Sequence, residues 1–207
     1  MSRTARFIKN SISTALMQAT TMFVGFFVPR IMMSVYGSEI NGLISSISQF
    51  IAYFNLVETG IAGAAVWALY KPLADRDNKV INSIIVAVKN FYTKAGYIFV
   101  SLTLGLAFLY PMFIKVYVLD YAEVVCLIII LGCAGALEFF TLAKYRALLT
   151  ADQKTYIISL VTTIAIIMNA LIIAILSYQN INVVIVRAVA LLSVFLRSFL
   201  LWFYVRK

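Results

Sequence analysis

The fold is decided by residues 155–177, which read TYIISLVTTIAIIMNALIIAILS and contain no charged side chain. A helix needs roughly 20 apolar residues to cross a hydrocarbon core about 30 Å thick. Further stretches share this apolar character, at about 10–36, 40–70, 95–113, 122–143 and 181–204. The sequence therefore predicts an all-α, polytopic membrane bundle of about six transmembrane helices, with residues 1–207 forming a single transmembrane lobe.

The composition excludes a soluble globule. Hydrophobic residues make up 63% of the chain and charged residues only 12%, whereas soluble domains carry about 25% charged residues. A net charge of +9 would favour a nucleic-acid partner in a soluble protein. Here the basic residues lie next to the apolar runs. We therefore expect them to interact with membrane lipids and not with nucleic acid.

Basic residues also predict the orientation of the chain. They precede the first span and follow the second, fourth and sixth, whereas the opposite connections hold only Lys115. Because cytoplasmic loops are enriched in lysine and arginine, both termini are expected to be cytoplasmic. The residues concerned are Arg3, Arg6, Lys9, Lys71, Arg76, Lys79, Lys89, Lys94, Lys144, Arg146, Lys154, Arg206 and Lys207.

Residues 79–112 would reach about 50 Å as one helix, which is longer than one bilayer requires. In the first part of this stretch, Ile81, Ile84 and Val88 share one helical face, and Asn82 and Lys89 lie away from it. Such a pattern is typical of an amphipathic helix in the membrane interface. We therefore predict an interfacial helix at about 79–94, before the third span.

The residues required for catalysis are scarce. The chain contains no histidine, which removes the commonest general base and nitrogen ligand. No Gly-rich phosphate loop with a lysine is evident. Cys126 and Cys133 would lie about 10.5 Å apart on one helix, too far for a disulfide, and are read as packing residues. We expect no enzyme, no metal site and no cofactor.

Five charged residues fall inside the predicted spans. A charge there costs about 2.5–3.5 kcal/mol on insertion scales, so it usually faces a cavity or a partner. There are also structural interpretations: Arg30 and Arg187 could extend to the outer head groups, Glu138 could pair with Lys144 or reach the interface, and Glu58 could pair with an arginine without contacting substrate. The five substrate-binding candidates are Arg30, Glu58, Glu138, Arg187 and Arg197.

Polar and small residues form one stripe along each of the first two spans. At about 100° per residue, their spacing of three and four places each set on one helical face. Such a stripe indicates either close helix packing or an aqueous cavity. The first contains Ser11, Thr14, Gln18, Thr21 and Gly25, and the second contains Asn41, Ser45, Ser48, Ala52, Asn55, Thr59 and Ala62. Gln18, Asn41, Ser45 and Asn55 are the polar cavity-lining candidates.

Five short segments resemble bacterial polysaccharide flippases of the O-antigen and capsule repeat-unit exporter group. This group is related to the lipid II flippase and to multidrug and toxin extrusion antiporters. The resemblance follows the chain in order: RFIKNS at 6–11, YGSEINGL at 36–43, LVETGI at 56–61, LYKPLA at 69–74 and LTADQ at 149–153.

The resemblance implies two six-helix lobes around a central cavity, with this chain as the N-terminal lobe. It implies export of an undecaprenyl-diphosphate-linked oligosaccharide across the bacterial inner membrane, with cavity arginines contacting the diphosphate. Arg30 best matches such an arginine, and Arg187 and Arg197 match less well. Since family chains have about twelve to fourteen spans, a second lobe is the expected partner. Transport could also be coupled to an ion, whose identity the sequence does not give.

Two other functions stay open from the sequence. One is an ion-coupled antiporter for drugs or small solutes in the same superfamily. The other is a membrane scaffold that organises glycan-assembly enzymes without transporting anything itself. The excess of intramembrane arginine over acidic residues favours an anionic substrate and therefore the flippase.

Overall fold

The computed structural model describes residues 3–54, 56–114 and 118–206, and every regular element in these ranges is helical. This confirms the all-α prediction. Five described helical stretches are long and apolar enough to cross a membrane, namely Arg6–Phe54, Asn78–Phe113, Tyr121–Leu142, Thr155–Tyr178 and Val183–Val205. The chain is therefore built as a multi-pass membrane protein.

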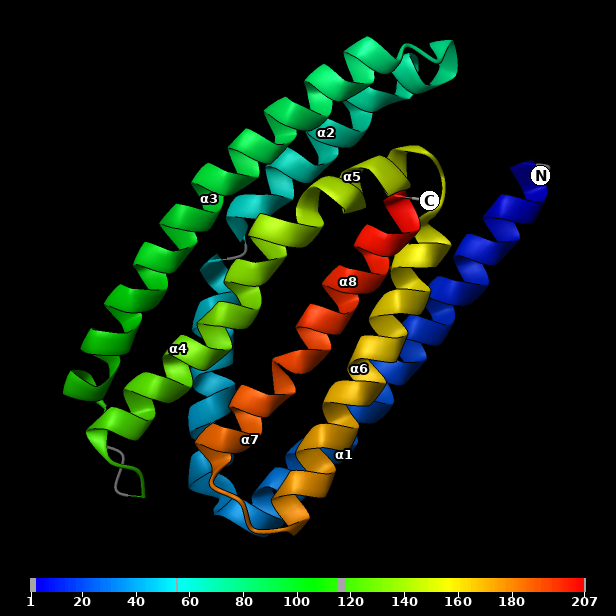
Figure 1. Cartoon of the computed structure of the whole chain (residues 1–207). Coiled ribbons are helices and arrows are strands. Elements are labelled where there is room, and N and C mark those ends of the chain that lie inside the picture. The colour runs from blue at the N-terminus through cyan, green and yellow to red at the C-terminus, as the bar shows by residue number, and fades with distance from the viewer. Residues whose placement is uncertain (1–2, 55, 115–117, 207) are drawn as a thin grey trace.

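Helix α1 (Arg3–Phe54) is divided into two arms at Gly37, whose backbone has φ 86° and ψ 168°. Residues that carry a Cβ almost never adopt these backbone angles, so the glycine is what permits the chain to reverse here. Pro29 lies inside the first arm. The chain runs down one side of the bundle and returns behind it (Figure 1), as the predicted turn between the first two spans requires.

The second predicted span is made of two elements, the second arm of α1 and helix α2 (Leu56–Asp75). Asn55, between them, lies outside the described residues. Helix α2 extends beyond the predicted span of about 40–70, because it continues through Pro72 to Asp75. Proline removes only its own backbone N–H, and the N–H groups of the residues after it can still donate to carbonyls of the preceding turn.

Helix α3 (Asn78–Phe113) is uninterrupted, so the predicted interfacial segment at about 79–94 and the predicted third span are parts of one helix. At 1.5 Å per residue, its length is about 54 Å. Its start is capped by Asp77, which accepts from the N–H groups of Lys79 and Val80. Buried positions recur every three or four residues from Val88 through Ala95 and Phe99 to Tyr110. These buried positions form one continuous stripe along α3.

The fourth span contains a change of helix type. Helix α4 (Tyr121–Leu137) passes into the π-helical segment η1 (Glu138–Leu142) and then into α5 (Ala143–Ala151). Cys126 and Cys133 are exposed on α4, so their interpretation as packing residues is wrong. The helical phase turns Val124, Leu127 and Ile128 inward instead.

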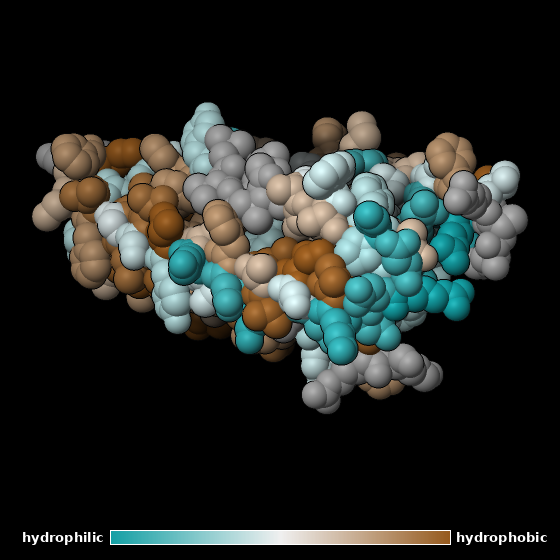
Figure 2. Space-filling view, turned by 90° about the horizontal axis from the view of Figure 1, so that it is seen from above, coloured by the Kyte–Doolittle hydropathy of each residue, from teal (hydrophilic) through white to brown (hydrophobic). Residues whose placement is uncertain are grey.

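The last helices are α6 (Thr155–Tyr178), α7 (Val183–Ala190) and α8 (Leu192–Arg206). The first arm of α1 packs along α6, while α3 packs along α4, and α7 and α8 lie between these pairs (Figure 1). The beginning of α1 and the end of α8 lie at the same end of the bundle. Looking down on that end, Figure 2 shows hydrophilic side chains gathered on one part of it and apolar ones elsewhere.

Candidate functional site

Glu138 opens the π-helical segment between α4 and α5. In a π-helix the backbone hydrogen bonds span five residues, and such segments often occur at functional sites. Here the segment is tied to α8 by a hydrogen bond of 2.9 Å between the hydroxyls of Thr141 and Ser198. The Glu138 side chain is thereby held beside α8.

Two guanidinium groups meet the Glu138 carboxylate from different helices. Nη2 of Arg197, on α8, donates to Oε1, and Nη1 of Arg146, on α5, lies 3.5 Å from Oε2. The side chain of Arg197 is 17% exposed, against 33% for Glu138 and 43% for Arg146. Arg197 is thus the more buried cation of the two.

Two cavities meet at this cluster, one of about 320 Å³ and one of about 310 Å³. Both are lined by Glu138, Thr162 and Arg197. The larger contacts α1 at Thr21, Val24 and Gly25, and the smaller contacts it at Thr14 and Met17. The two partly polar cavities therefore lie next to each other along the first arm of α1, with the charged cluster between them.

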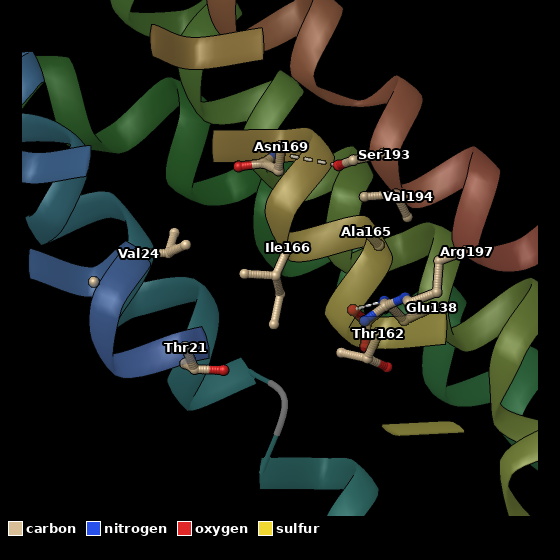
Figure 3. Close-up of a pocket in the computed structure, with 11 residues that line it drawn as sticks. Thr21, Val24, Glu138, Thr162, Ala165, Ile166, Asn169, Ser193, Val194 and Arg197 are labelled. Atoms are coloured by element: carbon tan, nitrogen blue, oxygen red, sulfur yellow. Dashed lines mark hydrogen bonds and ion pairs between the residues drawn. The ribbon is translucent and has the colours of Figure 1, made fainter. Parts of the chain in front are cut away.

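The larger cavity lies beside the break between α7 and α8, where the last span is held by side-chain hydrogen bonds. Nδ2 of Asn169 donates to the Ala190 carbonyl at 3.3 Å and to the Ser193 hydroxyl at 3.1 Å. Ser193 also donates to Ala190 at 2.7 Å. Backbone carbonyls released inside a membrane bundle need such partners. Figure 3 shows Thr21 and Val24 on α1, at the α6 side of that helix, and Arg197 and Glu138 next to each other near Thr162 of α6.

The smaller cavity is bordered by polar contacts between α1 and α6. The hydroxyls of Thr14 and Ser159 lie 3.2 Å apart. Nearer the N-terminus, Asn10 donates to the Gln153 carbonyl at 3.0 Å and accepts from the Tyr156 N–H at 2.8 Å. In the same turn, a hydrogen bond to Asp152 at 2.6 Å raises the pKa of Lys154.

Of the five predicted charged residues, the structure brings together Glu138 and Arg197. Arg30 is exposed on the first arm of α1. Arg187 lies on α7, where no described residue accepts a hydrogen bond from its buried Nε. Glu58 belongs to α2, but its side chain lies outside the described residues. The cluster is therefore built from distant parts of the chain rather than from one polar stripe.

The two predicted stripes have different surroundings. On the first arm, Thr14, Thr21 and Gly25 line the pockets, although Thr21 and Gly25 are also exposed, and the exposed Gln18 lines neither pocket. On the second arm, Ser45 is exposed and Asn41 is half-buried, while Ile44 and Ile47 of the same arm enter the core. Asn55 lies outside the described residues. The described part of the second stripe, from Asn41 to Ala52, thus lies largely on the outside of the bundle.

Sequence reasoning missed Arg146, which it assigned only to membrane topology, and also Thr162, Asn169 and Ser193. Arg146 follows Glu138 by eight residues, which places it about 80° away on an ideal α-helix. The wider π-helical turn takes up an additional residue and brings the two together. A search for opposite charges about two turns apart would have suggested this pair.

The described residues contain no group of three or more His, Cys, Asp or Glu side chains that could hold a metal ion. The arrangement instead offers guanidinium donors, hydroxyls and an amide, which suit an anion. The fold and the cluster together define a multi-pass helical membrane protein with a charged, hollow centre. No protein-family model, curated protein or solved structure matches this chain.

Proposed function

We propose that the chain is one lobe of an alternating-access transporter that exports undecaprenyl-diphosphate-linked oligosaccharide units across the bacterial inner membrane. These units would serve the synthesis of O-antigen or capsule. The chain would work without a cofactor and would perform no covalent chemistry. A second lobe, on the same or another polypeptide, would complete the transport path.

One observation carries this proposal: the ion-paired cluster of Glu138, Arg146 and Arg197 lines pockets within an apolar bundle. Charges among membrane helices are costly and usually mark a substrate or ion pathway. Guanidinium groups are always charged and present a planar fork of donors that suits phosphate oxygens. In the predicted spans, Arg30, Arg187 and Arg197 outnumber Glu58 and Glu138, which disfavours the cationic compounds that a drug antiporter would carry.

The outward-facing polar residues of α1 support a second lobe. Gln18, Arg30 and Ser45 are exposed, although the same helix also exposes many large apolar side chains, including Phe23, Phe26 and Tyr53. Polar groups of a transmembrane helix are unfavourable against lipid tails. They would be satisfied by a wet cavity between this lobe and another one, where Arg30 would be available to the substrate.

In this proposal the diphosphate and the sugars occupy wet space while the polyprenyl tail stays in lipid. Arginines attract the diphosphate from the basic end of the bundle and release it when the opposite side opens. Rocking of one lobe against the other around a site near the membrane centre is the usual form of such transport.

The test is made in the bacterium that produces the protein. Deletion of the gene should abolish the surface polysaccharide and cause lipid-linked repeat units to accumulate in the inner leaflet. Arg197→Ala and Arg30→Ala should each reduce export strongly, and the corresponding lysine variants should reduce it less, because lysine keeps the charge without the fork.

Glu123→Gln, which changes a single charge at a contact with Asn182, is the control for a charge change outside the cluster. It should export normally. A deletion strain with unchanged surface polysaccharide and no accumulated lipid-linked units would refute the proposed function. Loss of export of cationic compounds in that strain would favour the antiporter instead.

A further inference from the structure

Another pocket lies between α2, α3 and α5. Its volume is about 470 Å³, within the range of about 300–1,000 Å³ that small-molecule sites usually have. Trp67 and Tyr70 of α2 and Tyr92 of α3 supply aromatic walls, and Thr150 of α5 supplies a hydroxyl. Helix α5 packs against both α2 and α3 (Figure 1). Three distant segments of the chain therefore form one pocket of mixed aromatic and polar character.

The aromatic rings of α2 are exposed at this pocket instead of being buried in the bundle. Trp67 is 79% exposed and Tyr70 is 51% exposed, and positions three apart lie on the same face of a helix. Gly63, four residues before Trp67, lines the same pocket, and a Cβ on it would meet nothing within 4 Å. One face of α2 thus presents two aromatic rings beside open space.

The pocket lies at the edge of the hydrocarbon core or beyond it. Its wall residue Tyr92 stands between Lys89 and Lys94 on α3, and both lysines are exposed. Exposed charges are costly among lipid tails, so this level of α3 lies at the head groups or in water, on the side predicted to be cytoplasmic. The pocket therefore suits a polar molecule that reaches it from water.

The pocket is also next to the hollow space around Glu138. Arg146 and Thr150 line both this pocket and the cavity of about 310 Å³ at the ion pair. A molecule held between α2, α3 and α5 is therefore separated from that cavity only by these two side chains of α5.

A sugar ring has the kind of surface that these walls recognise. One face of a pyranose presents C–H groups, which pack on the electron-rich face of an aromatic ring, while its hydroxyls point outward around the edge. The Trp67 N–H and the hydroxyls of Tyr70 and Thr150 are hydrogen-bonding groups at the pocket. A lipid tail would use none of them, and a cation is disfavoured by the permanent charge of Arg146.

We propose that Trp67 and Tyr70 form a binding site for a pyranose ring of a glycan, in the pocket between α2, α3 and α5. The assignment of this glycan to the lipid-linked substrate rests on the proposed function; the binding of a sugar does not. In the flippase, the site holds a sugar of the repeat unit on the side from which the unit is loaded.

The alternative is a purely structural role for the two aromatic residues. Tryptophan and tyrosine are common at the membrane interface, where they anchor helices among the head groups. An anchoring role predicts that Trp67 responds to the lipid composition and not to soluble sugars. A sugar site predicts a response to a pyranose, and loss of that response when the pocket is filled.

The experiment follows the fluorescence of Trp67 in the full chain, in nanodiscs of zwitterionic lipid. Since the chain has two tryptophans, Trp202→Phe leaves Trp67 as the single reporter. The probes are the methyl pyranosides of glucose, galactose, N-acetylglucosamine and rhamnose. At least one should change the fluorescence with a millimolar Kd, as expected for so small a ligand. Sorbitol, an open-chain polyol without a ring face, should not.

Two further substitutions show whether the sugar occupies this pocket. Gly63→Leu places a side chain in the open space beside Trp67, and Tyr70→Ala removes one ring. Each should weaken sugar binding by about tenfold or more, comparable with the loss of one stacked ring. Gly105→Leu is the matched control, because a Cβ on Gly105 also meets nothing within 4 Å and Gly105 does not line this pocket.

An unchanged Trp67 signal with all four pyranosides would overturn the inference. An equal response to sorbitol would do the same, as would undiminished sugar binding by Gly63→Leu. Circular dichroism shows whether each variant is folded. If either Gly63→Leu or Tyr70→Ala does not fold, the other variant decides.

A second arm identifies the source of the sugar by measuring surface polysaccharide in the producing bacterium. Gly63→Leu should reduce export relative to Gly105→Leu if the sugar belongs to the lipid-linked unit. Sugar binding together with normal export by Gly63→Leu would contradict that source and favour a soluble glycan. Sugar binding in a protein whose deletion leaves the polysaccharide unchanged would support the site while contradicting the flippase. Gene-dependent export without any sugar binding would support the flippase while contradicting the site.

Discussion

Arg197 on α8 donates to the carboxylate of Glu138, which lies 59 residues earlier on the π-helical segment η1. Its neighbour Ser198 bonds to Thr141 of the same segment at 2.9 Å. Two consecutive residues of α8 are thus attached to one helical turn. This double contact holds the last span against the fourth, and Glu138 and Arg197 line both cavities.

Removal of one partner of this ion pair should destabilise the protein more than removal of both. Hydrogen bonds to charged groups contribute about 1.5–3 kcal/mol, and an unpaired buried charge adds a penalty. We expect Arg197→Met to lower the free energy of unfolding by about 2 kcal/mol, with part recovered by adding Glu138→Gln. Unfolding in mixed micelles, followed by circular dichroism, gives the values. Strictly additive effects of the two substitutions would show that the pair is not coupled.

Gly37→Ala should weaken the reversal of α1. The backbone at φ 86° and ψ 168° lies in a region where side chains are strained by about 1–3 kcal/mol, although a Cβ there would meet open space. Gly42→Ala is the control, since it also faces open space and lies within the helical second arm. Gly42→Ala should be neutral or slightly stabilising. Equal thermal stability of the two variants would contradict the strain at Gly37.

Gly135→Ala should separate α3 from α4. A Cβ on Gly135 would lie 2.5 Å from Cζ of the buried Phe99, while one on Gly105 would meet nothing within 4 Å. Overpacking of this kind costs about 1–3 kcal/mol. Unfolding measurements in micelles should show a loss for Gly135→Ala and none for Gly105→Ala. A loss of similar size in both would mean that helix flexibility, not contact, limits stability.

Asn10 should anchor the start of α1 to the turn before α6. Its amide group donates to the Gln153 carbonyl and accepts from the Tyr156 N–H, and each hydrogen bond contributes about 1 kcal/mol. Asn10→Ala should lose both bonds, whereas Asn10→Asp keeps the acceptor and should lose about half as much stability. Hydrogen exchange at the Tyr156 amide is the direct measurement. Unchanged protection of that amide in Asn10→Ala would contradict the anchor.

The general form of the protein could be predicted because it depends on local properties. Apolar length and the scarcity of charge decide that segments such as 155–177 become membrane-crossing helices. The reversal at Gly37 could be predicted because glycine is the residue that tolerates its backbone angles. Helix boundaries were less predictable: α3 is a single helix because its packing stripe continues from Val88 to Tyr110, and a change in surface polarity does not interrupt it.

The candidate site was only partly predictable. Glu138 and Arg197 stand out in the sequence because charge is costly inside apolar spans, but nothing local joins them. Their meeting depends on how α8 packs against the fourth span, and Arg146 joins them because the π-helical turn shifts its helical phase.

The sequence by itself determined that this chain is a helical membrane protein with few, expensive intramembrane charges, because hydrophobic length and charge cost are properties of each segment. The tertiary structure alone decided which of those charges meet, because ion pairs form between side chains that packing brings within a few ångströms. It turned Arg30 outward and placed Arg197 and Arg146 on one carboxylate between two cavities.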